Sequence, residues 1–122
     1  MNEKSYKVEA ELPMRISHFS DFDKVNAQLQ KFVRILEKFY GTTIWYIGMD
    51  MFGDEILERF TFNNGGFMEI ELRKSKLKAF FSSKEHANRF KEALEEAVKP
   101  MFRSRIDVRI KEEFINIGDI FN

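Results

Sequence analysis

The chain has 122 residues, its 20 lysines and arginines are balanced by 20 aspartates and glutamates, and it contains no cysteine. This length suffices for one domain with its own hydrophobic core. The neutral balance favours neither a polyanion nor an acidic membrane as partner, and the lack of cysteine excludes a disulfide framework, a thiolate nucleophile and a zinc–thiolate site.

Charged residues stand throughout the first ten positions, which excludes the apolar core of a signal peptide there. The longest charge-free run, Phe39 to Met49, is about half of a membrane span. We therefore expect a cytoplasmic protein that does not cross a membrane. Abundant Lys, Glu and Arg, with only two glutamines, would suit a thermophilic source.

The first predicted elements are a strand and a helix. Apolar and charged residues alternate from Tyr6 to Leu12, which indicates a strand with one buried face. Ser20 followed by Asp23 resembles a capping box, and Gly41 is suited to end a helix. The apolar residues between them recur at spacings of three and four: Phe22, Val25, Leu29, Phe32, Leu36 and Phe39. We expect this helix to pack on its own sheet rather than form a coiled coil.

The stretch from Thr42 to Phe81 predicts four antiparallel strands joined by three tight turns. A two-residue turn at Gly53-Asp54 separates apolar from polar residues well. It pairs Trp45 with Phe62, Ile47 with Phe60, Met49 with Glu58 and Met51 with Ile56 on one face, and Tyr46 with Thr61 and Gly48 with Arg59 on the other.

The separation of apolar from polar residues also selects the next two turns. A three-residue loop over 63–65 keeps Phe60 opposite Met68 on the apolar face, whereas a two-residue loop would mix the faces. A turn at Lys74-Ser75 would pair Leu72 with Leu77, Ile70 with Ala79, Met68 with Phe81 and Glu71 with Lys78.

Ser82 and Glu85 form an S-x-x-E capping box, and Pro100 ends the second helix that they predict. A late strand follows over Arg105–Ile110. The predicted order is β-α-β-β-β-β-α-β, an α+β fold with an antiparallel sheet and two helices packed on one face. Residues 1–111 form the predicted domain, and 112–122 form an apolar arm or docking tail with Phe114, Ile117, Ile120 and Phe121.

Residues that could carry chemistry are few. His18 beside Asp21 and Asp23 could suggest a metal site, but helix capping accounts for both aspartates, and His86 has no nucleophile at a known spacing. The glycines of segment 63–66 suit a hairpin rather than a phosphate cradle. We assign no catalytic residue, metal or cofactor.

Glu58 is the one polar residue that the register places on the apolar face. A buried carboxyl needs a partner or a raised pKa, as in many catalytic acids. We favour two simpler explanations over catalysis: a β-bulge near Ile56–Glu58, or a side chain that escapes at the sheet margin.

The other face of the predicted sheet is a candidate interaction face because aromatic and arginine side chains anchor many interfaces. Its residues are Tyr46, Arg59, Phe67, Lys78 and Phe80. We expect a small non-enzymatic domain that forms a homodimer through this face or the C-terminal arm. A solvated sheet face with incidental aromatics would show the same pattern.

Two other functions remain open. Nucleic acid could bind the same face of a dimer, with Phe67 and Phe80 stacking on bases or wedged between them. The cations at phosphates would be Arg59, Arg73, Lys76 and Lys78. Alternatively, a small molecule could bind in a pocket or enzyme site between helix and sheet that involves Glu58.

Overall fold

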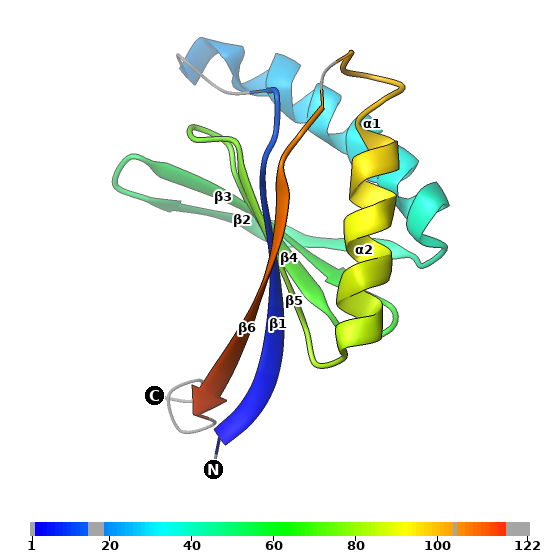
Figure 1. The fold of residues 1–122 in the computed structure, drawn as a ribbon. Helices are drawn as coiled ribbons and strands as arrows, with labels where there is room; N and C mark the ends of the chain where they lie inside the picture. The colour runs from blue at the N-terminus through cyan, green and yellow to red at the C-terminus, as the bar shows by residue number, and fades with distance from the viewer. Residues whose placement is uncertain (1, 15–18, 104, 117–122) are drawn as a thin grey trace.

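The computed structural model describes residues 2–14, 19–103 and 105–116. They form one six-stranded antiparallel sheet and two helices, in the predicted order β-α-β-β-β-β-α-β (Figure 1). The elements are β1 (Asn2–Glu11), a short 3-10 helix (Phe19–Asp21), α1 (Phe22–Tyr40), β2 (Ile44–Phe52), β3 (Glu55–Phe62), β4 (Phe67–Glu71), β5 (Lys76–Phe81), α2 (Lys84–Ala97) and β6 (Val108–Asn116). The predicted α+β fold is confirmed. No helix among the described residues is long and apolar enough to cross a membrane.

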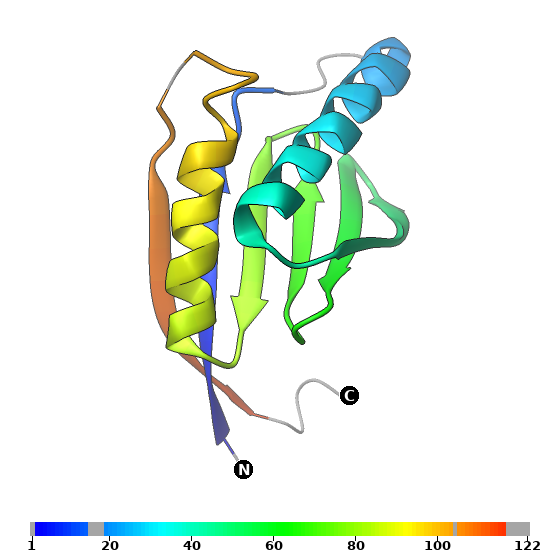
Figure 2. The same cartoon turned by 90° about the vertical axis from the view of Figure 1, so that its right-hand side faces the viewer.

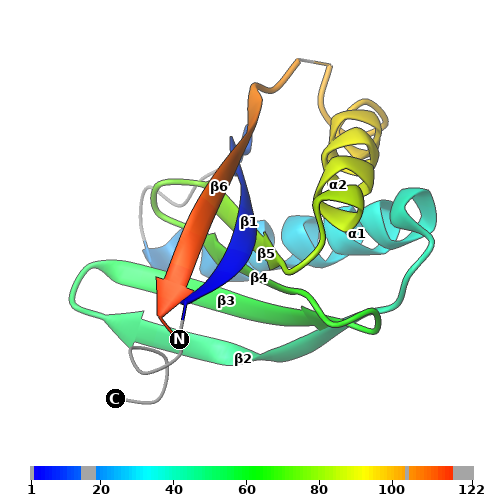
Figure 3. The same ribbon diagram turned by 60° about the horizontal axis from the view of Figure 1, so that its bottom comes forward.

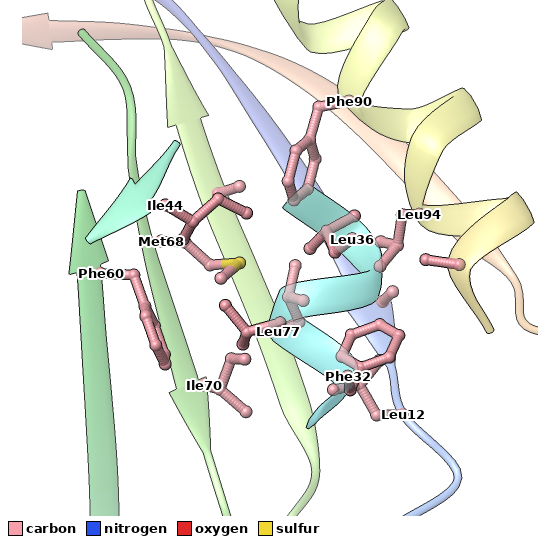
Figure 4. Close-up of a cluster of buried hydrophobic side chains, with 14 of the residues drawn as sticks. Leu12, Phe32, Leu36, Ile44, Phe60, Met68, Ile70, Leu77, Phe90 and Leu94 are labelled. Atoms are coloured by element: carbon pink, nitrogen blue, oxygen red, sulfur yellow. The ribbon is translucent and has the colours of Figure 1, made fainter. Parts of the chain in front are cut away.

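The strands lie in the order β2-β3-β4-β5-β1-β6, so β2 and β6 are the two edges. Both helices cover one face, hereafter the helix-covered face, and the other face is open (Figure 2). The core lies between these layers, where side chains of α1 and α2 meet those of β3, β4 and β5 (Figure 4). Phe32, Leu36, Phe60 and Leu77 are fully buried there.

The N-cap of each helix is one residue later than predicted, and the C-terminal end of α1 is at the predicted glycine. Gly41 ends α1 at φ 74°, and its N–H donates to the Glu37 carbonyl, as its left-handed preference predicts. The N-cap of α1 is Asp21 rather than Ser20. The N-cap of α2 is Ser83 rather than Ser82, because the Ser83 hydroxyl accepts the His86 N–H at 3.4 Å. Phe39, predicted in the buried stripe of α1, is 50% exposed.

The β2–β3 register is correct near the turn and wrong beyond Gly48. Met49 opposes Glu58 and Met51 opposes Ile56, as predicted. A bulge between Tyr46 and Gly48 then shifts the remaining pairs by one residue. A one-residue shift reverses which face a side chain occupies. Trp45 therefore opposes Thr61 on the open face, and Tyr46 opposes the buried Phe60 on the helix-covered face.

The β3–β4 loop is confirmed, whereas the β4–β5 register is wrong by two residues. Phe60 opposes Met68, and the Phe62 N–H donates to the Gly66 carbonyl across the three-residue loop. In the next hairpin Ile70 opposes Leu77, Met68 opposes Ala79 and Glu71 opposes Lys76, so the connection spans Leu72–Ser75. The Glu71 carboxylate accepts the N–H groups of Ile56, Arg73 and Lys74 at 3.0, 3.1 and 2.6 Å, which fixes this longer turn.

The late strand begins at Val108 rather than Arg105 and continues to Asn116. It pairs with β1 through Lys4 opposite Phe114 and Asn2 opposite Asn116. Residues 112–116 of the predicted arm are thus part of the sheet. Ile117, Ile120 and Phe121 lie outside the described residues, as does His18.

Candidate interaction surface

An aromatic row crosses the open face. The strand pairing sets Trp45, Thr61, Phe67, Phe80, Lys7 and Lys111 side by side across six strands. The rings of Phe67 and Phe80 stack, with centroids 4.7 Å apart and planes inclined by 19°. Phe67 remains 45% exposed. The row therefore presents apolar surface at one end and two lysines at the other.

A charged row runs beside it. Its members, again in strand order, are Gly48, Arg59, Glu69, Lys78, Glu9 and Arg109. Charges of opposite sign alternate, and Arg59 forms ion pairs with Asp50 and with Glu69, the latter at 3.5 Å. Such cross-strand pairs neutralise most of the field that a polyanion would experience.

Lys7, in the aromatic row, forms ion pairs with two glutamates, one of which, Glu9, belongs to the charged row. Its ammonium lies 2.8 Å from the Glu113 carboxylate and 3.0 Å from that of Glu9. The hydrogen bond to Glu113, and then that to Glu9, raises the pKa of Lys7, and the bond from Lys7 lowers the pKa of Glu9. Between β1, β5 and β6 the open face has a hollow of about 440 Å³ whose lining includes Lys76, Lys78 and Glu11.

Four of the five predicted face residues lie together, because Arg59, Phe67, Lys78 and Phe80 occupy neighbouring positions in these two rows. Tyr46 does not join them, since the bulge turns it to the helix-covered face. Arg73 lies in the β4–β5 turn rather than on a strand.

Tyr46 instead meets Glu58. The hydroxyl of Tyr46 lies close to the Glu58 carboxyl, whose Oε2 atom has no hydrogen-bond partner among the described residues. Glu58 is only 1% exposed, and its burial raises the pKa of the carboxyl above its usual range. Burial and the neighbouring carboxyl likewise raise the pKa of Tyr46 to about 12. Glu58 thus lies on the apolar face opposite Met49, as its register predicted, and its side chain is buried there. The hollows at the open face and beside α2 are lined by other residues.

The strongest surface feature was missed from the sequence, and it is the edge strand β2. Six of its large apolar side chains are between 40% and 60% exposed: Trp45, Tyr46, Ile47, Met49, Met51 and Phe52. These side chains lie on both faces of β2. Among the described strands only β3 is paired with β2, which lies at the edge of the sheet (Figure 3). The signal in the sequence was the nearly continuous apolar run IWYIGMDMF, which is typical of a strand buried on both faces.

Two side chains of helix α1 hydrogen-bond to the backbone of Ile44, the first residue of this edge. Arg34 Nη2 donates to the Ile44 carbonyl at 3.0 Å, and the Ile44 N–H donates to Glu37 Oε2 at 2.8 Å. The two side chains are held together by bonds from Arg34 Nη1 to the Glu37 carboxylate at 2.9 and 3.1 Å. They thereby occupy the backbone groups of Ile44 that a neighbouring strand would use.

Among the described residues no group of three or more His, Cys, Asp or Glu side chains could hold a metal ion. No family model matches the chain. No curated protein matches it either. A solved structure of an adenosylmethionine decarboxylase from Aquifex aeolicus VF5 is similar at a TM-score of 0.45 and 10% identity, over 94% of this chain and 93% of that one.

Proposed function

We propose that this protein is a small, cytoplasmic, non-enzymatic domain that works by self-association, with a homodimer as its basic form. The observation that carries the proposal is the exposed apolar surface of β2. Large contiguous apolar patches on a soluble domain mark interaction sites, whereas single exposed side chains need no explanation.

The size of this surface fits a dimer. Six half-exposed large side chains offer about 100 Å² each, given that a large aromatic buries roughly 150–250 Å² in full. Burial of about 600 Å² on each copy, before any backbone or rim contribution, gives about 1,200 Å² in total, at the lower end of stable interfaces. The aromatic row adjoins this surface through Trp45 and extends it across the open face.

The test is light scattering of the full chain over a range of concentrations. We expect a dimer for the natural chain and a monomer for the double variant Ile47→Lys with Met51→Lys, since both side chains are more than half exposed and their loss leaves the core intact. The matched control places lysines at the exposed helix positions Ala27 and Asn88 and should remain dimeric. A natural chain that is monomeric at every concentration would refute the proposal.

Two further variants separate the surfaces that could carry the contact. Replacement of Phe67 and Phe80 by serine removes the stacked pair of the open face. Replacement of Ile117, Ile120 and Phe121 by serine removes the apolar character of the chain end. If either variant dissociates the dimer and the β2 variant does not, the contact lies on the corresponding surface instead of β2.

A second candidate function is binding of single-stranded nucleic acid on the open face. It is favoured by the exposed Phe67–Phe80 stack, which shares its row with Lys7 and Lys111. Aromatic rings that bind bases commonly stand beside cations that meet phosphates. Against it, both lysines have carboxylate partners. Retention on immobilised DNA or RNA that falls steeply with salt would support this function, and no retention at low salt would end it.

A further inference from the structure

We propose that two copies associate by antiparallel pairing of their β2 edges, so that Trp45 of one copy opposes Phe52 of the second and the two sheets become one. This inference rests on the proposed self-association and adds its geometry. Its basis is the contrast between the two edges of the sheet.

The β6 edge is protected and the β2 edge is not. Strand β6 carries Arg109, Lys111, Glu112 and Glu113 among its nine residues, and charged side chains are a common means of preventing edge pairing. Strand β2 carries one charge, Asp50, which is already paired with Arg59. The sequence of β2 is that of a central strand, yet the fold places it at an edge, so a further strand would complete it.

The side chains of α1 fix where the free edge begins. Because Arg34 and Glu37 occupy the backbone groups of Ile44, strand pairing can start only after that residue. The available edge is therefore Trp45–Phe52, which precedes the Gly53-Asp54 turn. If each copy contributes this whole segment to a two-fold pair, Trp45 meets the second copy's Phe52 and Tyr46 meets the second copy's Met51.

The faces of the flanking residues agree with this register. Trp45 and Phe52 both lie on the open face, since they oppose Thr61 and Glu55. Tyr46 and Met51 both lie on the helix-covered face, opposite Phe60 and Ile56. Ile47 is the extra residue of the bulge, so it stays unpaired in each copy. The flanking pairs then match when the two-fold axis passes through Met49, which opposes Met49 of the second copy.

Charge is compatible with the same register. Asp50 would oppose the second copy's Gly48, which lies on the same open face, so the two Asp50 carboxylates do not face each other directly. A register centred on Asp50 would also match faces from Gly48 to Phe52, but it would set like charges opposite each other, which is unfavourable in a strand pair.

The absence of cysteine makes disulfide trapping specific. Directly opposed residues in an antiparallel pair have Cα atoms about 4.5–5.5 Å apart, within the range that a disulfide spans. Full-length Trp45→Cys and Phe52→Cys variants, mixed and oxidised, should yield a covalent dimer. Each variant alone should not, because six paired steps along the strand separate identical positions by about 20 Å. Mixed Ala27→Cys and Asn88→Cys chains serve as the exposed control.

Light scattering of the reduced cysteine variants accompanies the trapping, and amide hydrogen exchange of the natural chain is measured at low and high concentration. We expect protection of amides within 45–52 to rise with concentration. Efficient trapping of either variant alone, or a dimer with neither mixed trapping nor added protection, would overturn strand pairing while leaving self-association standing. A monomeric natural chain would overturn both proposals.

Discussion

The contact between α1 and β2 gives the sharpest stability prediction. Glu37→Ala removes the acceptor of the Ile44 N–H, and Ile44 is only 1% exposed. A buried donor without a partner costs about 1–3 kcal/mol, whereas loss of the exposed Arg34–Glu37 pair adds only about 0.3–0.5 kcal/mol. We therefore expect the free energy of unfolding to fall by about 2 kcal/mol.

The assay is urea unfolding, combined with hydrogen exchange at the Ile44 amide. Lys38→Ala is the control, because Lys38 is the exposed neighbour in the same helical turn and the change has the same effect on helix propensity. Glu37→Gln keeps an acceptor and should lose about half as much as Glu37→Ala, on the order of 1 kcal/mol. The reasoning fails if Glu37→Ala is no less stable than Lys38→Ala and exchange at Ile44 is unchanged.

Three further predictions concern other contacts. Burial raises the pKa of Glu58 in the folded chain, so its contribution to stability is present below the unfolded pKa and is lost as pH rises through the folded pKa. In urea titrations, the stability of Glu58→Gln relative to the natural chain should therefore increase from pH 4 to pH 8. Parallel pH profiles of the two proteins would contradict this. Gly66→Ala should lose about 1–3 kcal/mol, because a Cβ there would lie 2.8 Å from the Phe81 ring and 2.9 Å from the Phe80 carbonyl; unchanged thermal unfolding would show that the site yields freely. A double-mutant cycle of Phe67→Ala and Phe80→Ala should give a coupling of about 0.5–1.5 kcal/mol, and additive losses would mean that the stack contributes nothing beyond area.

Local patterns predicted the elements and most of the faces, because each depends on short-range chemistry. The Gly53-Asp54 turn was enough to place Glu58 opposite Met49. The β4–β5 register could not be obtained in this way. A shift of two residues leaves every side chain on its face, so the pattern did not distinguish Leu77 opposite Leu72 from Leu77 opposite Ile70. The decision came from Glu71, whose carboxylate caps the longer turn.

The candidate surface was harder to predict because it depends on strand order. The run Ile44–Phe52 predicts a strand but not its position in the sheet. That position follows from the insertion of β1 between β5 and β6, which joins segments about 70 to 110 residues apart in sequence. With β1 on that side, β2 is left at the opposite edge and its apolar side chains are exposed.

The bulge at Ile47 links the buried carboxyl to this edge. Without it, Tyr46 would lie on the open face, Ile47 would oppose Phe60, and Glu58 would lose its hydroxyl neighbour. A buried carboxyl with no hydrogen-bond donor is costly, so the bulge stabilises the position of Glu58. The same bulge places Trp45 on the open face at the end of the aromatic row. One local irregularity therefore places a hydroxyl beside a buried carboxyl and sets which side chains the β2 edge presents to a second copy.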